Sequence, residues 1–127
     1  MNEHDGILLI GSGNPGKRVE MRALLEHLPL KLCVQEDLGD AIAIAETGGS
    51  YAENASLKAK TLAGHFGLWT IADDTGLEVD ALDGAPGLHS ARLLGPGASD
   101  AQRRARLLEM LASEPKPWNA RFRCVAA

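Results

Sequence analysis

Short apolar runs and helical spacing alternate along the first half of the chain. Residues 7–10 form a compact apolar run that ends at Gly11, which predicts a buried strand feeding a turn-rich loop. Apolar side chains then recur near helical spacing until Pro29, so a helix should follow the loop. Residues 30–34 fit a second strand. Residues 36–45, where alanine and isoleucine alternate, fit either a strand or an irregular connection.

Capping patterns mark two helices in the rest of the chain. Ser50 and Glu53 have the spacing of a capping box, in which a hydroxyl and a carboxylate satisfy the first amides of a helix. They predict a helix that runs to about residue 64. Ser99 and Gln102 repeat the pattern ahead of a helix that should end near residue 112.

Three more strands are expected from the remaining apolar positions. Residues 69–72 form a short apolar run that leads straight into Asp73 and Asp74, so we expect this acidic pair on a loop at the end of a strand. Residues 77–82 and 119–127 alternate between apolar and polar side chains, as half-buried strands do. The length of 127 residues predicts that residues 1–127 form a single domain.

Composition narrows the class of protein. Hydrophobic residues make up 45% of the chain and charged residues 24%, as in ordinary soluble proteins. The net charge of −4 has the wrong sign for coating a nucleic acid polymer. Two cysteines are too few for a disulfide framework. No signal peptide pattern opens the chain, and no apolar run reaches the roughly 18 residues of a membrane span. We therefore expect a cytoplasmic protein that binds no membrane.

The loop after the first strand has two possible motif readings. With Gly11 it satisfies the G-x-G-x-x-G pattern of dinucleotide-binding folds, and Glu36 lies near where a ribose-binding acid would be sought. Pro15 weighs against that reading because it removes an amide. The loop also opens like a P-loop, but Arg18 stands where a magnesium-binding hydroxyl is required.

The dinucleotide-binding and P-loop interpretations both place an anion site at this loop. Backbone amides at the start of a helix stabilise negative charge, and Lys17 adds a cation beside them. The plain alternative is a tight turn with a solvated lysine. Lys58 shares a helix face with Asn54 and could reach a phosphate. Arg92, after a rigid Gly-Ala-Pro-Gly turn, could clamp a substrate oxyanion.

Acidic residues supply a candidate magnesium site. Asp73 and Asp74 are consecutive, so their carboxylates point in different directions. Magnesium bound to a nucleotide takes only one or two protein carboxylates, and Glu53 is the best second ligand in the sequence. Each acid also has a structural alternative, because Glu53 could simply complete its capping box and the aspartates could form a polar turn.

Three separated segments together resemble the signature blocks of the inosine triphosphate pyrophosphatase family. The first is Ser12-Gly13-Asn14-Pro15-Gly16-Lys17, the second runs from Glu46-Thr47-Gly48 through Glu53-Asn54-Ala55-Ser56-Leu57-Lys58-Ala59, and the third runs from Ile71-Ala72-Asp73-Asp74-Thr75-Gly76-Leu77 through Gly84-Ala85-Pro86-Gly87-Leu88-His89-Ser90-Ala91-Arg92. The third segment is the most specific. The resemblance covers nearly the whole chain, from residue 7 to residue 125.

The resemblance implies a fold, a reaction and a set of site residues. The fold is α/β, with a central mixed sheet, flanking helices and a nucleotide cleft between two lobes, usually in a homodimer. The reaction is hydrolysis of abnormal purine nucleoside triphosphates to monophosphate and pyrophosphate. Substrate would be bound by Ser12, Gly13, Asn14, Pro15, Gly16, Lys17, Lys58, Thr75 and Arg92. Glu53, Asp73 and Asp74 would hold Mg²⁺, and Asp74 would accept the proton of the attacking water.

The chain departs from the family pattern at its end. Family members continue with a glycine-rich Phe-Gly-Tyr-Asp block and a Ser-His-Arg block that help to recognise the base, and neither block occurs in these 127 residues. We therefore expect the C-terminal part of the family domain to be missing. A non-catalytic nucleotide-binding or dimerisation remnant is the alternative function. The related Maf-like nucleotide pyrophosphatases are a third possibility, against which residues 73–92 argue. The preferred base stays open.

Overall fold

The computed structural model describes residues 6–95 and 97–127 as two compact units. The first unit comprises Met1–Asp74 with Val125–Ala127, and the second comprises Thr75–Cys124. Two strands run from one unit into the other. The described helices include none that is long and apolar enough to cross a membrane.

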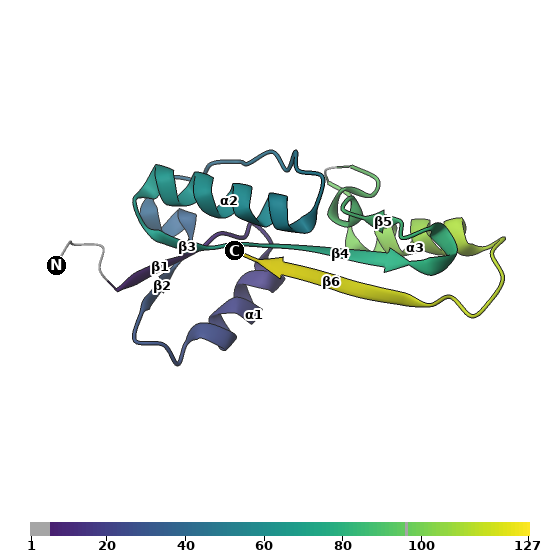
Figure 1. Ribbon diagram of the computed structural model, residues 1–127, viewed down its shortest axis with the longest axis horizontal. Coiled ribbons are helices and arrows are strands. Elements are labelled where there is room, and N and C mark those ends of the chain that lie inside the picture. The colour runs from purple at the N-terminus through teal and green to yellow at the C-terminus, as the bar shows by residue number, and fades with distance from the viewer. Residues whose placement is uncertain (1–5, 96) are drawn as a thin grey trace. The chain divides into compact units, whose positions relative to one another are not determined.

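The first unit is a small parallel sheet with a helix on each face. Its elements are β1 (Ile7–Ile10), α1 (Pro15–Leu25), β2 (Lys31–Cys33), a 3-10 turn η1 (Gln35–Leu38), α2 (Tyr51–Phe66) and β3 (Trp69–Ile71). The strand order is β2-β1-β3, and both pairs are parallel. Figure 1 shows α1 and α2 on opposite sides of this sheet. The strands predicted near residues 7, 30 and 69 and both predicted helices are confirmed.

Among the described strands of this sheet, β1 is a continuous apolar run, and its last two residues, Leu9 and Ile10, are fully buried. By contrast, β2 and β3 each begin with an exposed residue, Lys31 and Trp69. The core of this unit is formed by the buried side chains of Leu9, Cys33, Leu62 and Leu68. Burial raises the pKa of the Cys33 thiol, and the nearby carboxylate of Asp37 raises it further. Cys33 therefore packs as a small apolar side chain.

The second unit contains antiparallel pairing and one helix. Its elements are most of β4 (Asp73–Val79), η2 (Asp80–Leu82), β5 (Pro86–Gly87), η3 (Ser90–Arg92), α3 (Asp100–Leu111) and most of β6 (Ala120–Ala126). The strand order is β5-β4-β6, with β4 and β5 antiparallel. Ser99 and Gln102 form the predicted capping box at the start of α3. The predicted α/β class, with parallel and antiparallel pairing, is confirmed.

Two expectations about β4 are wrong. The acidic pair was expected on a loop, but Asp73 and Asp74 are the first residues of the strand, and both are buried. A strand was also expected over residues 77–82, whereas β4 ends at Val79 and a 3-10 turn follows. Turn-forming residues mislead here because strand pairing continues through them: the amides and carbonyls of Ala72 and Ala127 exchange both hydrogen bonds, at 2.9 and 2.8 Å.

The start of α2 is held by side chains of its own first turn. Ser50 Oγ accepts from the Glu53 amide at 3.1 Å, as predicted. The reciprocal half of the capping box is different, because the Glu53 carboxylate accepts from the amide of Gly49, at 2.6 Å, and not from that of Ser50. Gly48 packs against this turn so closely that an added Cβ would lie 2.6 Å from Asn54 Oδ1 and 2.7 Å from Glu53 Cβ.

We expect Gly48→Ala to lower the free energy of unfolding by about 1–3 kcal/mol, since the methyl group has no room beside the first turn of α2. Gly64→Ala is the matched control: position 64 lies inside α2 with nothing within 4 Å of an added Cβ, so alanine there should stabilise by about 0.5–1 kcal/mol. Urea unfolding of both variants measures the difference. Equal effects would show that the close approach at Gly48 does not exist in solution.

Candidate functional site

The loop between β1 and α1 is buried at Gly11 and Ser12, exposed at Gly13 and Asn14, and organised by hydrogen bonds of its own. Asn14 caps α1, with its Oδ1 accepting from the Lys17 amide at 3.1 Å, and the Asn14 amide donates to the buried Ser12 Oγ at 3.2 Å. Pro15 occupies the first helical position, where a missing N–H costs nothing. The amides of Asn14 and Lys17 are thus occupied in this conformation and Pro15 has none, whereas the exposed Gly13 and Gly16 supply candidate amides for a phosphate.

Lys17 joins the loop to the start of β4. Its Nζ lies 2.8 Å from Asp73 Oδ2, and the two side chains are 28% and 5% exposed. The ammonium therefore faces a nearly buried carboxylate beside the loop, where it would also attract a phosphate. This contact brings together two residues that the sequence placed in the first and third signature segments.

Asn54 joins α2 to the same strand. Its Nδ2 donates to Asp74 Oδ2 at 3.2 Å, and its Oδ1 accepts from the amide of Gly48 at 2.7 Å. The side chain is fully buried. Asp73 and Asp74 therefore contact different helices, as consecutive strand residues should. Sequence analysis predicted no role for Asn54 beyond sharing a helix face with Lys58, and only its place in the second signature segment signalled it.

Lys58 lines a pocket of about 210 Å³ beside the loop. Its Nζ lies 2.8 Å from Glu46 Oε1, and the side chains are 14% and 25% exposed. The pocket is lined by Gly11, Gly13, Gln35, Ile42, Ala43, Ile44, Glu46, Lys58 and Leu62. Glu46 was quoted in the second signature segment but was not predicted as a site residue, and its contact with Lys58 is what draws attention to it.

Residues 40–48 form an extended segment, here called the strap, that has no regular secondary structure. It overlaps residues 36–45, for which the sequence left a strand and an irregular connection both open. From residue 42 to residue 48, its even-numbered residues are partly buried and its odd-numbered ones are exposed. Ile42 and Ile44 pack on the core, and Glu46 and Gly48 bind Lys58 and Asn54 of α2. At its start, Asp40 Oδ2 lies 2.8 Å from His65 Nε2. One face of α2 thus fastens the strap, because its residues 54, 58, 62 and 65 recur every three or four positions.

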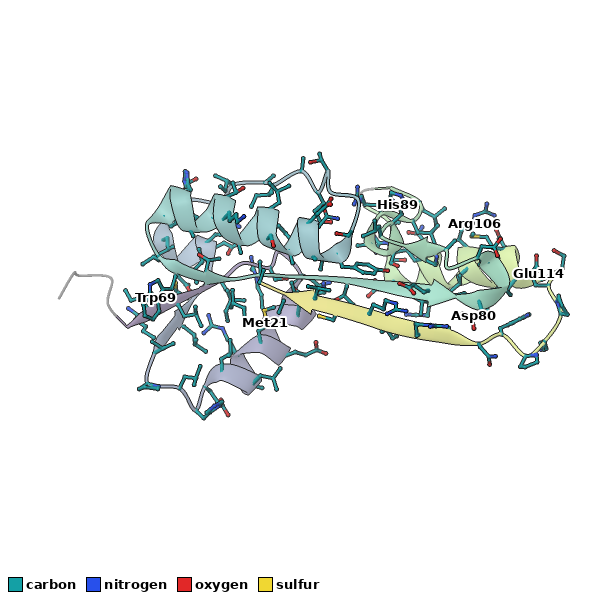
Figure 2. The ribbon with its side chains drawn as sticks, viewed as in Figure 1. Met21, Trp69, Asp80, His89, Arg106 and Glu114 are labelled. Carbon is teal, nitrogen blue, oxygen red and sulfur yellow. The ribbon has the colours of Figure 1, made fainter. Side chains whose placement is uncertain are left out.

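Two predicted substrate-binding residues belong to the second unit. Thr75 is half-buried in β4, and Arg92 is exposed at the end of η3. His89, Asp80 and Arg106, which Figure 2 labels, also project from this unit. The roles of Thr75 and Arg92 stay predictions.

The acidic residues suit a hard cation that arrives with a nucleotide. Residues 6–95 and 97–127 hold no cluster of three or more His, Cys, Asp or Glu side chains that could bind a metal ion alone. Magnesium with a nucleotide needs only one or two carboxylates, because phosphate oxygens and waters supply its other ligands. Asp74 is buried at the start of β4, and Glu53 is exposed next to the Asn54 that binds Asp74. This oxygen donor set fits such an ion.

Comparisons with known proteins identify relatives of the same kind. Residues 8–127 match the Ham1 family. A dITP/XTP pyrophosphatase of Exiguobacterium sp. is 48% identical over 92% of this chain and 59% of its own length. A dITP/XTP pyrophosphatase of Prochlorococcus marinus is 53% identical over 83% of this chain and 49% of its own.

A solved structure agrees with these matches. A HAM1 protein from Coxiella burnetii superposes with a TM-score of 0.81 at 39% identity, over 94% of this chain and 61% of that protein. The chain therefore spans about half to three-fifths of the length of these relatives. The resemblance seen in the three signature segments is confirmed, and the chain belongs to the Ham1 family.

Proposed function

We propose that this chain carries the phosphate-binding and metal-binding part of an enzyme that hydrolyses non-canonical purine nucleoside triphosphates, such as ITP, XTP and dITP, to monophosphate and pyrophosphate. The observation that carries the proposal is the meeting of the three signature segments in the first unit. Lys17 of the first segment contacts Asp73 of the third, and Asn54 of the second contacts Asp74 of the third. The names of the matched relatives, dITP/XTP pyrophosphatases, support the same reaction.

Two lysines are suited to bind the phosphates. Lys17 and Lys58 are each paired with a carboxylate at 2.8 Å, Asp73 and Glu46 respectively. A triphosphate carries more negative charge than either carboxylate, so it can compete for both ammonium groups. Charge that builds up on the departing pyrophosphate would be stabilised by the same cations. Ser12–Lys17 would hold the phosphates against the start of α1, while Thr75 and Arg92 are proposed further contacts.

Asp74 is suited to accept the proton of the water that attacks the α-phosphorus. Its Oδ2 is fixed by Asn54, which orients the carboxylate without adding charge. Glu53 and Asp74, with Asp73 beside them, would hold Mg²⁺. When bound, that ion neutralises phosphate charge and polarises the phosphoryl oxygens. A cytoplasmic location belongs to the same proposal, since substrates of this class occur in the cytoplasmic nucleotide pool. The homodimer that the resemblance implies is proposed with it.

The direct test is release of pyrophosphate from ITP, XTP, dITP and GTP by this chain. Turnover of the non-canonical nucleotides that Asp74→Asn abolishes would support the proposal. Binding without turnover would favour the alternative of a non-catalytic nucleotide-binding remnant. Absence of both binding and turnover would refute the proposal for this chain.

Magnesium binding should depend on Glu53 and Asp74. Glu53→Gln and Asp74→Asn each keep an acceptor for Gly49 and Asn54 while removing one negative charge, so each should weaken Mg²⁺ binding in the presence of a non-hydrolysable triphosphate by about tenfold or more. Calorimetric titration measures this. Asp80→Asn, which removes an exposed carboxylate of the second unit, is the control. Wild-type affinity in both site variants would remove this assignment.

Lys17 should bind phosphate and not the base. Lys17→Ala removes a charged donor that is worth about 1.5–3 kcal/mol, so ITP affinity should fall by about 10- to 100-fold while inosine affinity stays unchanged. Lys60→Ala, at an exposed position of α2, should alter neither. Fluorescence or calorimetric titrations of inosine and ITP decide it, and equal losses for the two ligands would contradict the assignment.

A further inference from the structure

Arg18 and Glu36 make contacts that neither motif reading of the loop explains. Arg18 Nε donates to the backbone carbonyl of Ser12 at 2.5 Å, and its Nη2 lies 3.0 Å from Glu36 Oε1. The Arg18 side chain is 21% exposed and that of Glu36 is 55% exposed. The Arg18 guanidinium thus connects α1 with η1, the turn after β2, and with Ser12, the first residue of the segment Ser12–Lys17, here called the phosphate loop.

The contact with Ser12 fixes the end of the loop that leaves the sheet. Ser12 Oγ accepts from the Asn14 amide, and Asn14 caps α1 through Lys17, so the orientation of the Ser12 peptide is passed to the rest of the loop. Arginine suits this task because its planar fork donates in two fixed directions at once, which a lysine ammonium on a flexible stem does not do.

We propose that Arg18 is a positioning residue that holds the phosphate loop in its binding conformation, and that Glu36 acts by orienting Arg18. The proposal rests on the proposed function, since it assigns a task toward the phosphates of the same substrate. It also explains why a charged residue at position 18 can replace the hydroxyl of a P-loop: this side chain works on the loop's own backbone and not on a metal ion.

Glu36 behaves as a carboxylate engaged in such a contact. Its pKa is lowered, first by a hydrogen bond from its own backbone amide and then by the bond from Arg18. Because the pKa is lowered, the Glu36 carboxylate is charged and paired with Arg18 at any pH above the ordinary pKa of a glutamate. The pair is lost only when the pH falls through the lowered pKa and the carboxylate is protonated. The pair is therefore complete at neutral pH.

The first readout needs no ligand. We expect Arg18→Ala to speed hydrogen exchange of the Asn14 and Lys17 amides by about tenfold or more, with exchange of the α2 amides unchanged. Arg22→Ala is the matched control, because Arg22 lies one turn further along α1 and pairs with Asp37 at 3.7 Å without touching the loop. Unchanged exchange at Asn14 and Lys17 in Arg18→Ala would overturn the proposal, whether or not the chain binds nucleotides.

The second readout is calorimetric titration with inorganic triphosphate. We expect about tenfold weaker binding in Arg18→Ala, a smaller loss in Glu36→Ala, and no further loss when Glu36→Ala is added to Arg18→Ala. Arg18→Lys keeps the charge but not the fork, so it should resemble Arg18→Ala. Wild-type affinity in Arg18→Lys, or additive losses in the double variant, would overturn the proposal. Failure of the wild-type chain to bind triphosphate would instead refute the proposed function, with hydrogen exchange still deciding the role of Arg18.

Discussion

The buried contact between Asn54 and Asp74 is the interaction on which the arrangement of the first unit depends. Asn54 is fully buried, and its amide group both donates to the carboxylate and accepts from Gly48. An apolar residue at position 54 would leave the Asp74 carboxylate and the Gly48 amide without this hydrogen-bond partner. Leaving a buried polar group unpaired costs about 1–3 kcal/mol. An aspartate would place a second carboxylate beside the first. Only a side chain with a donor and an acceptor satisfies helix, strap and strand together.

Near this contact, two lysines form ion pairs with carboxylates of the protein itself. Lys17 and Lys58 each face a carboxylate at 2.8 Å, and all four groups are partly or nearly fully shielded from water. Such pairs avoid the large penalty of an isolated shielded charge. On the proposed function, Asp73 and Glu46 act as internal counterions that keep the lysines in place until a phosphate replaces them. Substrate binding is then an exchange of partners and not the creation of new charge contacts from water.

The sequence predicted elements well where a local pattern decides them. The strand of residues 7–10 and the helix cap at Ser99 depend on apolar runs and local hydrogen bonds, and both formed as expected. Asp73 and Asp74 were misplaced because their turn propensity is overridden by pairing with residues far along the chain. The same limit applies to side-chain partners: the signature segments indicated Lys17 and Asp73, but no spacing rule could show that these two touch.

Arg18 and Glu36 show this limit most plainly. In the sequence they are 18 positions apart. Arg18 was considered only as a departure from the P-loop motif, and Glu36 only as a candidate ribose-binding acid of the dinucleotide-binding motif. Residues that become partners only on folding leave no local pattern in the sequence. The arrangement of the sheet brings them together, and the period of a helix or strand does not. Contacts of this kind had to come from the structure.

The alternating burial of the strap limits which insertions and deletions this segment can accept. Surface connections usually accept inserted or deleted residues at little cost. Here, from residue 42 to residue 48, the even-numbered residues face the protein and the odd-numbered ones face water. One residue gained or lost would reverse that order, as a slip of register does in a strand. Ile42 and Ile44 would turn to solvent, and Glu46 would leave Lys58. Length variation in this segment should therefore come in pairs of residues or not at all, although nothing in its secondary structure marks it as constrained.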